Sequence, residues 1–281
     1  MTHDPPPALH ATQLCAGYGA ATVLRGLDLC IEPGAFTALT GGNGSGKSTL
    51  LHSFCGSLRP TAGKVELEGT DLRALAPRRI SRRLAFLSQN PVAPEGLALA
   101  DLIRLGRHPH RGPFARWSRK DEDACATAMQ LTGTEAFAQR SLETLSGGQR
   151  QRGWIAMALA QQTDILLLDE PTTFLDLAHQ IEVMELLVRL VRDEGKTVVA
   201  VLHDLNQAAR HVDRMAVLRD GRILAEGRPD EVMTRETLRA GFGVDAEIHP
   251  DPVTGTPMCL PRPMPGTQRS GGEPHFRLPP E

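Results

Sequence analysis

The stretch Gly41-Gly42-Asn43-Gly44-Ser45-Gly46-Lys47-Ser48 decides the fold of this chain. It fits the phosphate-binding loop pattern G-x-x-x-x-G-K-[ST] at every specified position. Glycines let the backbone turn tightly and bring its N–H groups close to an anion. Lys47 supplies a positive charge for the β- and γ-phosphates, and Ser48 offers a hydroxyl to Mg²⁺. The stretch therefore predicts a site for a nucleoside triphosphate.

The flanking residues support this interpretation. Residues 35–40 are predicted to form a short buried strand that enters the loop, and residues 48–55 a helix that leaves it. The dipole at a helix N-terminus favours phosphate in this arrangement. The alternative is a glycine-rich surface turn, which would need neither the strand nor the helix.

Length and composition exclude several classes of protein. The chain has 281 residues, a hydrophobic content of 41% and a charged content of 23%, which are ordinary for a globular protein. A net charge of -2 gives no case for nucleic acid. The N-terminus lacks the pattern of a signal peptide, and the longest apolar runs are too short to cross a bilayer. We therefore expect a soluble protein whose membrane role, if any, comes through a partner.

The cysteines indicate a reducing compartment. None of the five forms a C-x-x-C pair, which argues against a structural zinc site. They are Cys15, Cys30, Cys55, Cys125 and Cys259. We expect reduced thiols in a cytosolic protein.

Three predicted buried strands end in polar residues. Gln89 follows residues 85–88, Asp169 and Glu170 follow residues 165–168, and His203 follows residues 197–202. Each could be a structural strand terminus, and adjacent acids are also an ordinary helix-cap signal. In an open parallel sheet, however, the carboxyl ends of the strands line the ligand crevice.

The two adjacent carboxylates are predicted to have different roles. Neighbouring residues on a strand point to opposite faces, so Asp169 and Glu170 cannot do the same job. One carboxylate can bind Mg²⁺ while the other interacts with the water.

A second anion site is predicted at Leu145-Ser146-Gly147-Gly148-Gln149. Ser146 is a plausible N-cap for a helix over residues 150–161, and the two glycines leave backbone N–H groups open at the helix start. A single Gly-Gly before a helix would be a cap without function. Two phosphate-competent helix starts in one chain need a further explanation.

The remaining segments suggest the domain organisation. Residues 1–10 are Pro-rich and expected to be disordered, residues 11–31 to form antiparallel strands, and residues 97–145 to form an inserted helical subdomain. Tyr18 is either a half-buried strand aromatic or a ring that stacks on a purine. The pair His108 and His110 is a weak metal signal, and a surface or contact loop is favoured. From residue 262 the chain is a Pro- and Gly-rich tail.

The assembled motifs resemble the ATP-binding cassette (ABC) ATPase family over residues 11–260. Matches fall on every named motif, in the family's order and spacing. They are Tyr18 (aromatic loop), Gly41 to Ser48 with Thr49 (Walker A), Gln89 (Q-loop), Leu145 to Gln149 (LSGGQ signature), Ile165 to Glu170 (Walker B and catalytic Glu), Leu175-Asp176 (D-loop) and His203 (H-loop). One departure is Gly42, where the family usually has Pro.

The resemblance implies a fold and a mechanism. The fold would be an α/β P-loop NTPase domain over residues 11–261, with a mostly parallel central sheet, an N-terminal antiparallel β-subdomain and a helical subdomain at about residues 90–160. Two copies would pack head to tail, so that ATP lies between Tyr18 and the Walker A loop of one copy and the signature residues Ser146 to Gln149 of the other.

The same resemblance implies roles at the sheet edge. Ser48, Asp169 and Gln89 would hold Mg²⁺, Glu170 would polarise the attacking water, and His203 would contact the γ-phosphate.

Three stretches are similar to one branch of the family, the importers of iron–siderophores, haem and cobalamin. They are residues 105–110, 171–180 and 251–257. The branch implies uptake of a ferric siderophore through membrane permease subunits, with a periplasmic or surface binding protein and a position on the cytoplasmic face of the membrane. Haem and cobalamin cargoes, a soluble cluster-assembly ATPase and a nucleotide-gated module without turnover remain as alternatives.

Overall fold

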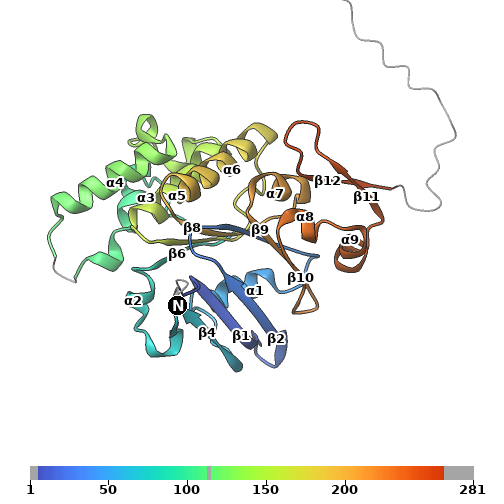
Figure 1. Cartoon of the computed structure of the whole chain (residues 1–281). Coiled ribbons are helices and arrows are strands. Elements are labelled where there is room, and N and C mark those ends of the chain that lie inside the picture. Colours follow the sequence, from blue (N-terminus) through green and yellow to red (C-terminus); the bar gives the residue numbers. More distant parts are fainter. Residues whose placement is uncertain (1–5, 113–114, 263–281) are drawn as a thin grey trace, which may run out of the picture.

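A six-stranded sheet forms the centre of the protein, as shown in Figure 1 by a computed structural model that describes residues 6–112 and 115–262. Its strand order is β10-β9-β3-β8-β7-β6, and all neighbours are parallel except β10, which pairs antiparallel with β9. The strands are β3 (Phe36–Thr40), β6 (Leu84–Leu87), β7 (Ile165–Leu168), β8 (Thr197–Val201), β9 (Arg214–Arg219) and β10 (Arg222–Gly227). The predicted mostly parallel α/β sheet is confirmed.

Both faces of this sheet are buried because its strands are apolar throughout. Successive residues of β8 alternate between two hydrophobic clusters: Val198 and Ala200 belong to one, Val199 and Val201 to the other. A strand covered on both sides needs apolar residues at every position, and this explains the continuous runs in the sequence.

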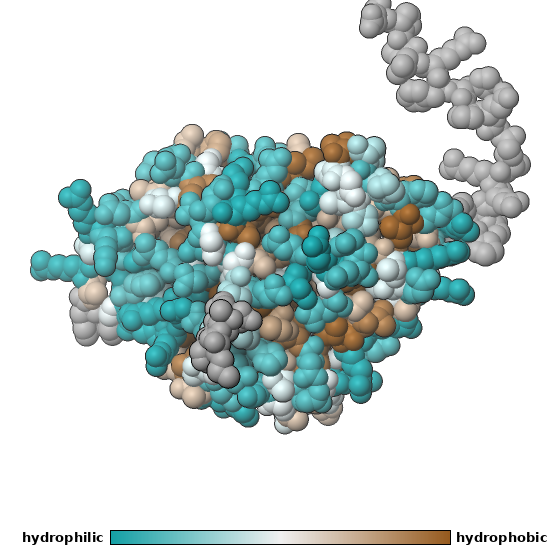
Figure 2. Space-filling view, viewed as in Figure 1, coloured by the Kyte–Doolittle hydropathy of each residue, from teal (hydrophilic) through white to brown (hydrophobic). Residues whose placement is uncertain are grey.

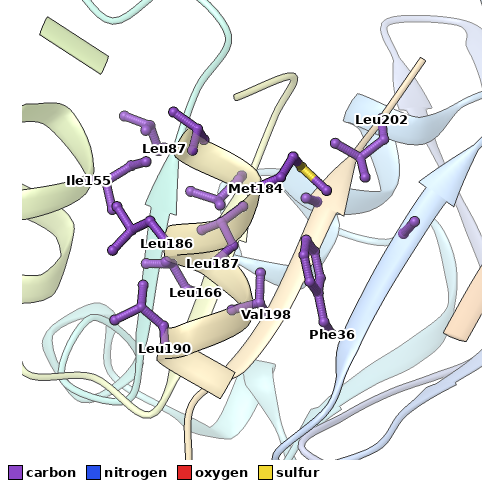
Figure 3. Close-up of a cluster of buried hydrophobic side chains, with 14 of the residues drawn as sticks. Phe36, Leu87, Ile155, Leu166, Met184, Leu186, Leu187, Leu190, Val198 and Leu202 are labelled. Atoms are coloured by element: carbon purple, nitrogen blue, oxygen red, sulfur yellow. The ribbon is translucent and has the colours of Figure 1, made fainter. Parts of the chain in front are cut away.

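Helices cover the first face of the sheet. They are α5 (Gly147–Ala160), α6 (Leu177–Arg192) and α7 (Leu205–His211). Figure 3 shows Leu187 and Met184 of α6 beside Leu166 of β7, Val198 of β8 and Phe36 of β3. Burial of each such side chain contributes about 1.5–3 kcal/mol, and this cluster fixes α6 to the sheet.

The second face is covered by α1 (Lys47–Phe54) and by a four-stranded antiparallel sheet, which lie below the central sheet in Figure 1. That sheet has the order β2-β1-β4-β5, with β1 (Leu9–Tyr18), β2 (Ala21–Ile31), β4 (Ala62–Leu67) and β5 (Thr70–Asp71). Strand β1 begins inside the segment that we expected to be disordered up to residue 10. Leu9 is fully buried and pairs with Ile31 and Leu67, which offsets the entropy of ordering it.

The helical insertion between β6 and β7 contains α3 (Leu99–Leu105) and α4 (Arg119–Thr132), which pack on α5. Buried Arg107 joins them: its Nε donates to Asp121 at 2.9 Å and its Nη1 to the carbonyl of Ala160 at 2.7 Å. The Ser118 hydroxyl and the Arg107 guanidinium lower the pKa of Asp121 to about 2. Short helical segments complete the middle of the chain: η1 (Leu72–Ala74), α2 (Pro77–Ile80), η2 (His108–His110), η3 (Glu135–Phe137) and η4 (Leu142–Thr144).

The C-terminal part adds α8 (Pro229–Val232), α9 (Arg235–Phe242) and a hairpin of β11 (Ala246–Pro250) and β12 (Pro257–Pro261). The hairpin is tied to α7. Asn206 accepts from the backbone N–H of Cys259 at 2.7 Å, and Arg210 pairs with the buried Asp251. The expected tail lies outside the described residues, apart from residue 262.

Hydrophilic residues dominate the surface in Figure 2, and hydrophobic ones gather there in small patches. None of the helices in the described part of the chain is both long and apolar enough to span a bilayer.

Candidate nucleotide site

The carboxyl ends of four parallel strands gather the predicted site residues at one edge of the central sheet. The Walker A loop follows β3, Gln89 follows β6, Asp169 and Glu170 follow β7, and His203 follows β8. The strand order β3-β8-β7-β6 makes these strand ends neighbours although they are far apart in the sequence. Hydrogen bonds join several of their side chains directly.

Glu170 is the centre of these contacts. Its carboxylate lies 2.6 Å from His203 Nε2 and accepts from Gln89 Nε2 at 2.6 Å and from the Thr173 hydroxyl at 2.9 Å. Burial acts to raise the pKa of Glu170, but hydrogen bonds from these three side chains, that of His203 foremost, outweigh it and hold the pKa below its ordinary value. The carboxylate is therefore ionised and can accept a proton.

The backbone of Glu170 is strained. Its φ is +54°, in the left-handed region that non-glycine residues rarely adopt. The turn that follows brings the Thr173 hydroxyl back to the carboxylate. Thr173 was not among the predicted site residues, although a hydroxyl three residues after the acid in a Pro-containing turn was a usable signal.

The Walker A loop wraps around the ammonium of Lys47. Its Nζ donates to the carbonyls of Gly41 and Gly42, each at 2.9 Å, and the residue is 6% exposed. Burial lowers the pKa of Lys47, while the carboxylates of Glu170 and Asp169 act in the opposite direction. A buried cation beside open backbone N–H groups fits an anionic phosphate chain.

The rest of the loop follows the same plan. Asn43 and Gly44 are exposed at its tip, Ser45 donates its backbone N–H to Gly42 at 3.2 Å, and Thr49 is buried in α1. Gly46 has a φ of +108°, which residues with a side chain rarely adopt, and a Cβ there would lie 2.8 Å from a methyl carbon of Leu24 in β2.

Ser48 and Asp169 form a small oxygen-rich pair. The Ser48 hydroxyl donates to Asp169 Oδ1 at 3.1 Å, and burial raises the pKa of this carboxyl. Hydroxyl and carboxylate oxygens are the donors that Mg²⁺ prefers, so the pair fits the ion. Gln89, also expected at Mg²⁺, has its amide nitrogen on Glu170 instead. Within residues 6–112 and 115–262, no group of three or more His, Cys, Asp or Glu side chains could hold a metal ion.

Ser146 caps α5 as predicted, but the helix already begins at Gly147, three residues before the predicted start at residue 150. Ser146 is the N-cap, its hydroxyl accepts from the backbone N–H of Gln149 at 3.2 Å, and Gln149 Oε1 accepts from the backbone N–H of Ser146 at 3.1 Å. The side chain of Gln149, which we expected to contact nucleotide, is therefore used as a capping box. Gly147 borders a cleft of about 350 Å³ that Gln89 also lines.

Tyr18 is the last residue of β1 and is 54% exposed. Its ring is accessible, as stacking requires, but it makes none of the contacts at the sheet edge described above. Its role at a purine stays a prediction.

Comparison with known proteins identifies the family. A family model described as ABC transporter matches residues 24–173, which is more than half of the chain. The chain belongs to the ABC transporter family, whose ATP-binding subunits are ATPases.

Two relatives and one solved structure are informative. The chain is 47% identical to the ferric enterobactin transport ATP-binding protein of Escherichia coli (strain K12), covering 93% of this chain and 97% of that protein. It is 46% identical to a probable siderophore transport system ATP-binding protein of Bacillus subtilis (strain 168), covering 90% and 92%. A dimeric, post-hydrolysis ATP-binding cassette with ADP and Pi has a TM-score of 0.69 at 30% identity, covering 78% of this chain and 98% of that one.

Proposed function

We propose that this chain hydrolyses MgATP and couples hydrolysis to the uptake of a ferric siderophore through a membrane permease. The observation that carries the ATPase part is the contact of Glu170 with Gln89 and His203, beside the Ser48–Asp169 pair and the buried Lys47. The siderophore cargo rests on the two relatives at 46% and 47% identity, which are named for siderophore transport.

The residues at the sheet edge have different roles in ATP hydrolysis. Lys47 and the loop amides bind the β- and γ-phosphates. Ser48 and Asp169 would hold Mg²⁺, which would supply charge neutralisation at the phosphates. Glu170 accepts the proton of the attacking water. His203 contacts the γ-phosphate, and its present distance of 2.6 Å from Glu170 lets it orient that carboxylate as well.

A second copy of this chain completes the site. The signature turn at Ser146 makes its capping bonds within α5 and leaves the backbone N–H groups of Gly147 and Gly148 outside that capping box. In a head-to-tail pair these groups reach the γ-phosphate bound by the other copy. Solved cassettes of the family form dimers, which supports this arrangement.

A groove beside α2 and α3 is the surface that we assign to the permease. It has a volume of about 740 Å³, and its lining combines an exposed Leu105 with the arginines Arg78, Arg104 and Arg111. Arg104 and Arg111 also lie 5.6 and 5.1 Å from the centre of the Trp117 ring, and Arg104 pairs with Asp101 at 3.0 Å, so the groove presents basic side chains next to apolar ones. This chemistry suits an amphipathic cytoplasmic segment with acidic residues. The subunit would then lie against the cytoplasmic face of the membrane.

Leu105→Glu is expected to uncouple transport from hydrolysis. A carboxylate at this lining position would neutralise the nearby arginines and repel an acidic segment, so uptake should fall about tenfold or more. ATPase activity of the isolated subunit should stay within about twofold, because Leu105 is 56% exposed and its loss disturbs no core. Co-purification with the permease and uptake in cells measure the effect. The control is Leu260→Glu, an exposed leucine on β12; equal losses in both variants would contradict the assignment.

The cargo can be tested directly. A strain that lacks this chain should lose uptake of ⁵⁵Fe-labelled siderophore and regain it with the unaltered chain, but not with Glu170→Gln. Normal iron uptake in the deletion strain together with lost haem or cobalamin uptake would contradict the siderophore assignment and leave the ATPase part standing. A substrate-binding protein outside the membrane would complete the system.

A further inference from the structure

The start of α5 is packed against one histidine side chain of α6. A Cβ built on Gly148 would lie 1.9 Å from Cδ2 and 2.4 Å from Cγ of His179. The imidazole ring therefore occupies the space that any other residue at position 148 would fill. The second glycine of the signature is required by this ring, and not by backbone conformation, because Gly148 is not among the residues with positive φ.

The same ring contacts the D-loop. His179 Nδ1 lies 2.6 Å from Oδ1 of Asp176, and the backbone N–H of His179 donates to the same oxygen at 3.0 Å. The backbone and side-chain hydrogen bonds of His179 hold the pKa of Asp176 below its usual range, so the carboxylate is ionised. One residue thus touches both the signature turn and the D-loop.

The two segments also lie close together at a second point. A Cβ on Gly147 would lie 3.3 Å from a methyl carbon of Leu175 in the D-loop. The side chain of Asp176 is 67% exposed, while that of His179 is 28% exposed. The carboxylate is thus presented outward by a ring that is itself largely covered.

We propose that His179 is a positioning residue that locks the signature turn and the D-loop of one chain into a single unit for presentation to a second copy. The inference rests on the proposed head-to-tail dimer, because both segments then act on the partner's nucleotide site. The imidazole sets the spacing between the N–H groups of Gly148 and the carboxylate of Asp176. Nδ1 donates to that carboxylate in the tautomer that carries its proton there.

Two variants separate the contributions of the ring's volume and of its hydrogen bond. His179→Leu fills the space over Gly148 without a donor, whereas His179→Asn keeps a donor near the position of Nδ1. We expect His179→Leu to lower kcat for ATP about tenfold, because a hydrogen bond to a charged group is lost. The dissociation constant of the ATP-trapped dimer, measured by sedimentation in a Glu170→Gln background, should rise by a similar factor. His179→Asn should restore both quantities to within about twofold of the unaltered chain.

Binding of nucleotide to a single chain separates positioning from general damage. It depends on Lys47 and the Walker A loop and should stay unchanged in His179→Leu. The control is His249→Leu, which removes a histidine that lies 2.9 Å from Glu247 on β11, and it should behave as the unaltered chain.

Three results would overturn the inference while the proposed function stands. They are normal kcat and dimerisation in His179→Leu, an Asn variant as impaired as the Leu variant, and a loss of single-chain binding that matches the loss of kcat. Absence of MgATP turnover in the unaltered chain would instead refute the proposed function and the inference together.

Discussion

Glu170→Gln is expected to lower steady-state ATP turnover by about a thousandfold, the scale of losing a positioned general base. The carboxylate is held by donors from three segments, and its lowered pKa keeps it ionised, so that it has a free site for the proton of water. An amide keeps the size of the side chain but cannot accept the proton of water. Nucleotide binding should survive, because Lys47 and the Walker A loop are untouched, and the dimer should remain trapped with ATP. Phosphate release and sedimentation with MgATP measure the two effects.

A matched change isolates the role of Glu170. Glu236→Gln makes the same chemical change at an exposed position on α9 and should leave turnover within about twofold. Turnover in Glu170→Gln equal to that of the control would remove Glu170 from the proposed mechanism. His203 or Asp169 would then be the remaining candidates for the proton acceptor.

The sequence predicted the sheet and its polar edge because both follow from local patterns. An apolar run such as residues 165–168 is typical of a strand buried on both faces, and the polar residue after such a strand lies at its carboxyl end. With several parallel strands, those edges coincide. The strand pattern therefore predicted that Gln89, Glu170 and His203 lie near one another, and their contacts in the structure agree with this, whereas their roles rested on the family resemblance.

Other features depended on tertiary contacts that no local pattern encodes. The ring of His179 over Gly148 joins residues on two helices, and the sequence offered only a Gly-Gly before a helix. Strand β1 starts early because Leu9 finds partners in β2 and β4. Gln149 looked available to a ligand, yet its amide closes a capping box with Ser146. In each case the contact is made by a residue from another segment, or by a side chain whose direction depends on packing.

Gly41→Ala should disable the Walker A loop, whereas Gly42→Ala next to it should be tolerated. Gly41 has a φ of +138°, and a Cβ there would lie 2.2 Å from the carbonyl oxygen of Leu218 in β9. Strain and overlap with backbone should cost about 3 kcal/mol of unfolding free energy. The carbonyl of Gly41 also holds the Lys47 ammonium, so displacing it should weaken nucleotide binding about a hundredfold, the scale of one charged hydrogen bond lost.

Gly42 supplies the control. Its carbonyl also accepts a hydrogen bond from Lys47, but its backbone conformation and surroundings do not require glycine. Its φ lies outside the left-handed region, and the nearest atom to an added Cβ is Gly241 O at 3.9 Å. Alanine there should keep binding within about twofold and raise stability by about 0.5 kcal/mol, because it restricts the unfolded chain. Urea unfolding and titration with a fluorescent ATP analogue measure both variants. Equal affinity in the two would show that the loop tolerates displacement at Gly41 and that Lys47 does not depend on this carbonyl. The opposite order, with Gly42→Ala the weaker binder, would contradict the prediction. It would mean that this chain needs glycine at a position where the family usually has proline.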